Sequence, residues 1–95
     1  MSELFTFIFE YRGGSYTSQH RGKDVDAALN VWAEKEVPTI YEIKPKHIKD
    51  IRSEIANKNE EPVVVGAGFI KNVWYMGFLS GNTNMRLMIV RTDDT

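Results

Sequence analysis

The sequence contains no cysteine among its 95 residues. That absence excludes disulfides, thiolate metal sites and cysteine nucleophiles together, and it is consistent with a reducing compartment. A surplus of either charge is also missing, because 12 Lys and Arg residues stand against 13 Asp and Glu residues. A dedicated nucleic-acid-binding domain usually carries a clear basic excess, so the overall charge argues against that function.

Long apolar runs are missing as well. No stretch approaches the roughly 18 consecutive apolar residues that a membrane-spanning helix needs. The opening MSELFTFIFEYR has neither the basic start nor the apolar run of a signal peptide. We therefore expect a cytoplasmic protein with no membrane partner.

What the chain does contain is the composition of a folded domain. Hydrophobic residues make up 42% and charged residues 26%, the latter close to the globular average of about 25%. A chain of this length normally forms one domain. We expect a single α+β domain over residues 1–95, with residues 92–95 as a loose tail.

Residues 4–12 alternate with a period of two, which predicts a β-strand. Four aromatic side chains share one face of it: Phe5, Phe7, Phe9 and Tyr11. The pair Gly13-Gly14 can take positive φ at both positions, which favours a two-residue hairpin turn there. That turn would place Tyr11 opposite Tyr16.

Residues 24–36 repeat apolar side chains at helical spacing, which predicts an amphipathic helix. Asp24 is a favourable N-cap, and Pro38 limits the helix near residue 36. Trp32 is the largest residue of the apolar face, and we expect it to lie against the sheet. Pro45 begins a second helix, whose thinner apolar stripe is surrounded by basic residues.

After Pro62 the sequence becomes rich in strand-forming residues, at 63–69, 73–79 and 85–92. The order is β-β-α-α-β-β-β, without the βαβ alternation of a parallel sheet. We therefore predict the α+β class. The expected architecture is a single layer of about five mostly antiparallel strands with two helices packed on one face.

The segment VVVGAG at 63–68 invites comparison with a dinucleotide-binding fingerprint, but no third glycine and no helix follow it. A hairpin with its turn at 71–72 is the better interpretation. It would pair Gly66 near Gly77 and Gly68 near Tyr75. The three glycines would then share one face of neighbouring strands, and this patch without side chains would serve either helix packing or a ligand groove.

Recognisable catalytic chemistry is missing. His20 and His47 show no triad or zinc pattern, and we expect ordinary structural or solvated roles for both. The motifs of the sequence predict no catalytic residue, no cofactor and no metal. A small-ligand protein or enzyme stays as a second alternative, with one weak cluster: Tyr11, Arg12, Tyr16 and His20.

The C-terminal strands carry apolar side chains on both faces. One face would hold Phe69, Trp74, Met76, Phe78, Leu87 and Ile89, and the other Val64, Tyr75, Leu79, Met88 and Val90. Two helices can cover only one face, so either the sheet curls on itself or the second face meets another chain. The candidate partner-binding residues are Tyr11, Arg12, Tyr16, Trp74, Tyr75 and Met88.

The segment KPKHIKDIR offers a first alternative, a nucleic-acid-binding helix. Its candidate phosphate-contacting residues are Lys44, Lys46, Lys49 and Arg52. The competing interpretation is a solvated helix face, since Asp50 and Glu54 offset part of this charge. With a net charge of −1, a protein partner is favoured over a nucleic acid.

The opening layout, a hairpin followed by a helix with the sequence DVDAALNVWAEK, resembles the start of small antitoxins of the HicB type. There, a hairpin precedes a helix that carries an Ala-Leu pair. The resemblance covers about a third of the chain and carries over no residues. We therefore predict a small, soluble, non-enzymatic protein-interaction module that is homo-oligomeric or shields a protein partner. A toxin-neutralising or immunity-type role is one specialisation, suggested by small size and missing chemistry.

Overall fold

The computed structural model describes residues 2–57, 63–64 and 72–93. Its elements in chain order are β1 (Glu3–Tyr11), β2 (Gly14–Gly22), α1 (Val25–Val31), a π-helical turn η1 (Trp32–Glu36), a 3₁₀ turn η2 (Val37–Thr39), α2 (Pro45–Ala56), β3 (Val63–Val64), β4 (Val73–Ser80) and β5 (Thr83–Thr92). Every described strand pair is antiparallel. The α+β class and the antiparallel sheet are confirmed.

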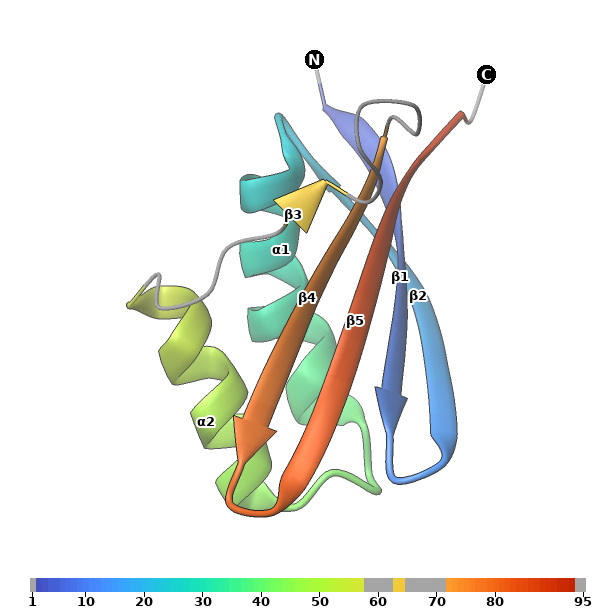
Figure 1. Cartoon of the computed structure of the whole chain (residues 1–95). Coiled ribbons are helices and arrows are strands. Elements are labelled where there is room, and N and C mark those ends of the chain that lie inside the picture. Colours follow the sequence, from blue (N-terminus) through green and yellow to red (C-terminus); the bar gives the residue numbers. More distant parts are fainter. Residues whose placement is uncertain (1, 58–62, 65–71, 94–95) are drawn as a thin grey trace.

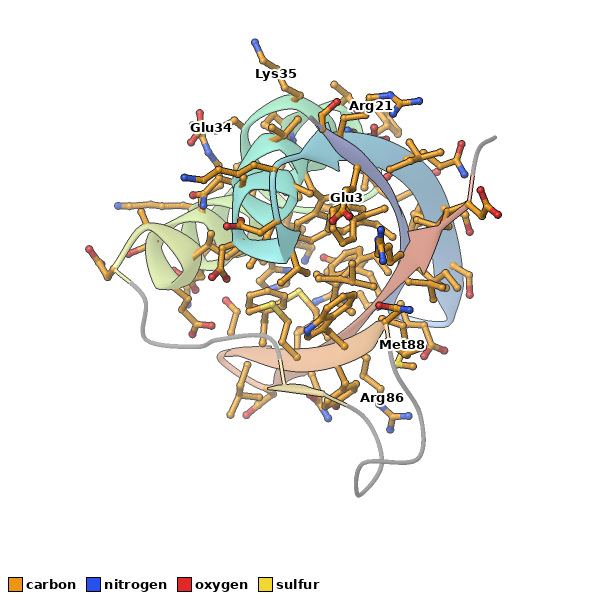
Figure 2. All side chains as sticks on the ribbon, turned by 90° about the horizontal axis from the view of Figure 1, so that it is seen from above. Glu3, Arg21, Glu34, Lys35, Arg86 and Met88 are labelled. Atoms are coloured by element: carbon orange, nitrogen blue, oxygen red, sulfur yellow. The ribbon has the colours of Figure 1, made fainter. Side chains whose placement is uncertain are left out.

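The strand order in the sheet is β2-β1-β5-β4-β3. Four of these strands have eight to ten residues, and β3 has two. The last strand of the chain lies between the first hairpin and β4, so β1 and β5 form the centre of the sheet. Both helices lie on one side of it (Figure 1), and the sheet curves around them (Figure 2).

The first hairpin forms as predicted, but its turn lies one residue earlier. Tyr11 pairs with Gly14, and the turn residues are Arg12 and Gly13. Both have positive φ, 49° and 83°, as a type I′ turn requires. The predicted partner of Tyr11 was Tyr16, which instead pairs with Phe9.

Gly14 lies in β2 and not in the turn. A Cβ on Gly14 would lie 2.9 Å from the Tyr16 hydroxyl, so the Tyr16 ring occupies the space above this residue. Because the turn moved by one residue, each partner moved by two, and every side chain kept its predicted face.

The first helix begins as predicted. The Asp24 carboxylate accepts a hydrogen bond from the backbone N–H of Ala27 at 2.9 Å. The predicted end near residue 36 coincides with the end of η1 at Glu36, and the short 3₁₀ turn η2 then leads the chain to Thr39. Pro38 is tolerated since it lies at the start of η2, where a backbone N–H needs no intrahelical partner.

Trp32 is the centre of the core, as its place on the apolar face predicted. It is fully buried and its ring stacks on Phe7, with centroids 5.8 Å apart and planes 5° from parallel. Edge-on contact with Phe9 at 5.3 Å and near-parallel contact with Phe78 at 6.3 Å complete its surroundings. The helix layer and two strands, β1 and β4, therefore meet at one side chain.

The predicted register of the β3–β4 hairpin is wrong. Val63 pairs with Tyr75 and Val64 with Trp74, whereas a turn at 71–72 would have put Gly68 beside Tyr75. Gly66 and Gly68 lie outside the described residues.

The predicted loose tail starts too early. Thr92 belongs to β5 and pairs with Leu4, because the ladder between β1 and β5 extends to that residue. Residues 94–95 lie outside the described residues.

Candidate functional site

The candidate site is the outer face of the sheet, by which we mean the side away from the helices. Phe5, Phe7 and Phe9 point into the core, so the even-numbered residues of β1 point outward. The same alternation directs Arg86 and Met88 of β5 outward, as Figure 2 shows. The face is thus fixed by the period of the strands.

An apolar row crosses the middle of this face. Ile8 of β1 pairs with Met88 of β5, and Met88 pairs with Tyr75 of β4. Ile8 is 37% exposed and Tyr75 is 39% exposed. Leu79, further along β4, is 65% exposed. We call Ile8, Met88 and Tyr75 the apolar row.

The rows on either side of the apolar row differ in character. On one side Thr6 pairs with Val90, and the Thr6 hydroxyl contacts that of Thr92 at 2.5 Å and accepts from Gln19 Nε2 at 3.1 Å. On the other side, Glu10 pairs with Arg86, so opposite charges lie on neighbouring strands. The outer face therefore has an apolar centre between a charged row and a mixed row, in which Gln19 and Thr6 are polar and Val90 and Val73 are apolar.

Gly77 shapes the end of the apolar row. A Cβ at this position would lie 3.5 Å from the Tyr75 hydroxyl, so the Tyr75 ring extends along the sheet over Gly77. A ring that lies along the strand presents its face to an incoming surface. Of the three glycines in the predicted patch, only Gly77 lies within the described residues. There, the missing side chain leaves room for the Tyr75 ring.

Two of the predicted partner-binding residues, Tyr75 and Met88, lie on the outer face. Trp74 does not: it is partly buried and its ring meets that of Phe5 edge-on at 5.8 Å. Consecutive strand residues point to opposite faces, so Trp74 and Tyr75 cannot serve one surface. The sequence-based list missed Ile8, which strict alternation with Phe7 and Phe9 would have placed outward.

The predicted contact point at the tip of the first hairpin is wrong for Tyr11. This side chain is 2% exposed, because α2 and the segment before it cover the end of β1. Tyr16 is partly buried against the core. Arg12 is exposed in the turn, with Cζ 5.5 Å from the Tyr11 ring centroid and Nη2 donating to the Thr83 hydroxyl at 3.3 Å.

His47 is the polar partner that holds Tyr11 inside. The Tyr11 hydroxyl oxygen lies 2.6 Å from His47 Nδ1, and the backbone N–H of Lys44 donates to the same oxygen at 3.4 Å. Tyr11 is therefore placed to donate its hydrogen to Nδ1. Of the two roles expected for His47, structural or solvated, the structure shows the structural one, since this residue is 6% exposed. Burial, helped by Arg12, Lys44 and other nearby cations, lowers its pKa.

His20 lies away from that pair, near the other end of the hairpin, opposite Phe5. Its Nε2 lies 3.0 Å from the Ser18 hydroxyl and 3.4 Å from a Glu36 carboxylate oxygen. Burial lowers the pKa of His20, and Glu36 opposes that effect. A hydrolytic triad uses both ring nitrogens, whereas Ser18 and Glu36 share one here. The weak cluster predicted for a ligand or enzyme site is therefore not assembled.

The basic residues of α2 are only partly available. Lys44, Lys46 and Lys49 are exposed, whereas Arg52 Nη2 donates to a Glu34 carboxylate oxygen at 2.8 Å. An open hollow of about 500 Å³ lies between η1 and α2, lined by Glu34, Pro45, Ile48, Lys49, Arg52, Ser53 and Ala56. Arg52 and Glu34 both line this hollow and form a salt bridge there. Arg52, the only arginine among the predicted phosphate-contacting residues, is therefore already paired with a carboxylate.

No protein-family model, no curated protein and no solved structure matches this chain. The resemblance of the opening hairpin and helix to HicB-type antitoxins therefore gains no support from these comparisons. Within the described residues, no helix combines the length and apolar character needed to cross a bilayer. Across the same residues, no His, Asp and Glu side chains gather in threes as a metal site would require.

Proposed function

We propose that this chain is a protein-interaction module that binds its partner through the outer face of the sheet. One observation carries this proposal: Ile8, Met88 and Tyr75 form an apolar row across three neighbouring strands, on the side of the sheet that the helices leave uncovered. The wet face of an antiparallel sheet is normally polar. A continuous apolar row there favours burial against another chain.

The chemistry of the row fits a protein surface. Aromatic residues and methionine are enriched at the centres of protein interfaces, where charged residues are depleted. Here Tyr75 and Met88 lie at the centre, while Glu10 and Arg86 lie at one side. A ring of polar or charged residues around an apolar centre is the usual anatomy of such an interface. A toxin-neutralising or immunity-type role would be one use of it.

The proposal is tested by placing a photocrosslinking amino acid on the surface. A benzophenone side chain replaces Tyr75 in one variant and Tyr41 in a matched control, so the same residue type is replaced in both. Tyr75 is 39% exposed on the outer face, and Tyr41 is 96% exposed in the connection before α2. Both variants are expressed in the native host and irradiated, and the adducts are identified by mass spectrometry.

We expect protein adducts from position 75 in clear excess over position 41, although position 41 is more exposed. Random collisions would follow exposure and favour position 41, so the reverse order indicates a specific surface. Equal or weaker crosslinking at position 75 would overturn the proposal. The adduct also identifies its own source, because a copy of this chain and a different protein give different peptides.

A second candidate function is nucleic-acid binding through α2. The observation in its favour is that Lys44, Lys46 and Lys49, at the start of α2, are all exposed. Against it, Arg52 is engaged by Glu34 and the chain as a whole has a net charge of −1. We therefore rank it below the protein-binding proposal.

A further inference from the structure

We infer that the occupant of the outer face is a second copy of this chain, packed about a two-fold axis that runs between β1 and β5. This inference rests on the proposed function and adds the partner and the geometry to it. The observation behind it is the pairing of β1 with β5, which sets complementary residues side by side in two neighbouring rows of the face, Ile8 with Met88 and Glu10 with Arg86.

The symmetry of two stacked sheets determines which residues meet. When identical sheets pack face to face, the two-fold axis lies in the plane between them, so an axis parallel to the strands exchanges strands on either side of it. An axis between β1 and β5 sets β1 of one copy against β5 of the other. Residues that are Cα partners within one copy then face each other across the interface.

The residues brought together in this way are complementary. Ile8 faces Met88 of the other copy, which buries these two members of the apolar row against each other, while Tyr75 lies over Thr17 of β2 in the other copy. Glu10 faces Arg86, which sets opposite charges together twice, once on each side of the axis. An axis along β5 itself would instead set Arg86 against Arg86, and like charges in contact are unfavourable.

The shape of the sheet selects the same axis. The sheet curves around the helices (Figure 2), so its outer face is convex and two copies touch first along the middle strands. In the order β2-β1-β5-β4-β3, the boundary between β1 and β5 is the midline of the four long strands. An axis on that midline also gives these four strands their greatest overlap, with β4 of one copy over β2 of the other.

The experiment measures mass by light scattering over a range of concentrations. The wild-type chain is compared with Ile8→Glu and with the control Val31→Glu. Ile8 is 37% exposed on the outer face and Val31 is 36% exposed on α1, so both variants place a carboxylate at an equally exposed β-branched position. We expect twice the 10.9 kDa chain mass for the wild type and for Val31→Glu, and the single-chain mass for Ile8→Glu.

Charge reversal then tests the axis itself. Glu10→Arg and Arg86→Glu each set like charges against one another in the dimer, so each should weaken it. The double variant Glu10→Arg with Arg86→Glu restores opposite charges and should restore the dimer. Both positions are exposed, and circular dichroism on each variant confirms that the fold is retained.

The results separate this inference from the proposed function. A wild-type chain that stays at the single-chain mass at millimolar concentration would overturn the second copy as partner, while crosslinks from position 75 to a different protein would leave the outer face as a binding surface. A dimer that survives both Ile8→Glu and the single charge reversals uses another surface, and it would overturn the inference too. Loss of the dimer in the double variant as well as the single ones would overturn the axis between β1 and β5.

Discussion

The hydroxyl oxygen of Tyr11 lies 2.6 Å from Nδ1 of His47, joining the end of β1 to the first turn of α2 inside the core. Nearby, the Ser80 hydroxyl donates to the Asp50 carboxylate, which joins the end of β4 to the same helix. Two polar contacts thus fix the N-terminal half of α2 over one end of the sheet. Their consequences for stability can be measured.

Tyr11→Phe should lower the free energy of unfolding by about 1–3 kcal/mol, the usual cost of leaving a buried polar group unsatisfied. The group left behind is His47 Nδ1, which is buried with its ring. Urea unfolding measures the loss. Tyr16→Phe is the control, because Tyr16 is partly exposed and should change stability less; equal losses in both variants would contradict the assigned role of the Tyr11 hydroxyl.

Stability should fall under mildly acidic conditions because His47 is buried in its neutral form. Its pKa is lowered in the folded chain, by burial first and by Arg12, Lys44 and Lys46 next. The unfolded state then binds more protons at low pH. The contribution of neutral His47 is therefore complete above the ordinary pKa of about 6.5, and it is lost as the pH falls through the lowered value.

The His47→Asn variant tests this assignment. An asparagine oxygen can accept the Tyr11 hydrogen at the position of Nδ1 without titrating. Urea midpoints measured across the acidic range should depend less on pH in this variant than in the wild type. Some dependence will remain, because burial lowers the pKa of His20 as well; an unchanged slope would mean that His47 does not govern the acid sensitivity.

Gly22→Ala should destabilise the fold by about 1–3 kcal/mol, as overpacking of a filled site does. A Cβ there would lie 2.5 Å from the backbone nitrogen of Ala28 and 3.0 Å from the Ala27 carbonyl carbon, so α1 would have to move off β2. Gly14→Ala is the matched control, since its added Cβ meets only the Tyr16 side chain, which can rotate. Thermal unfolding of both variants checks the expected order, and a larger loss for Gly14→Ala would count against it.

The two tryptophans and Tyr75 should separate folding from association. Trp32→Ala should cost about 3–5 kcal/mol of unfolding free energy, as for other buried aromatic side chains, because Trp32 is fully enclosed. Trp74→Ala should also destabilise the fold, by less, since it packs against Phe5 from a partly buried position. Tyr75→Ala should leave the fold nearly unchanged and weaken association.

Urea unfolding and light scattering on the same three variants check this order. The sequence alone named both Trp74 and Tyr75 as candidate partner-binding residues while placing them on opposite faces, and the structure directs Trp74 toward the core and Tyr75 outward. A Trp74→Ala variant that folds with wild-type stability but loses association would restore the original prediction.

We expect no measurable binding of single-stranded DNA by the wild type at low salt. The triple variant Lys44→Ala, Lys46→Ala, Lys49→Ala should therefore behave in the same way. Fluorescence anisotropy with a labelled oligonucleotide measures both. Binding by the wild type that falls steeply with salt and disappears in the triple variant would establish the nucleic-acid alternative.

The sequence by itself determined the local features of this protein. Strand alternation assigned Phe5, Phe7 and Phe9 to one face, Asp24 was identified as an N-cap, and Trp32 was identified as the anchor of the helix layer. Each depends on neighbours within a few residues, through strand or helix period and the hydrogen-bonding needs of a helix terminus. Such features are present in the chain whatever it later pairs with.

Only the tertiary structure decided which strands are neighbours and what covers each face. β5 lies beside β1, more than 70 residues away in sequence, and that pairing creates the Glu10–Arg86 and Ile8–Met88 rows. Tyr11 became a core residue because α2 brings His47 over it, and Trp74 is partly buried against the core because it packs on Phe5. Long-range pairing is chosen by total burial and hydrogen bonding across the whole sheet, which no local pattern records.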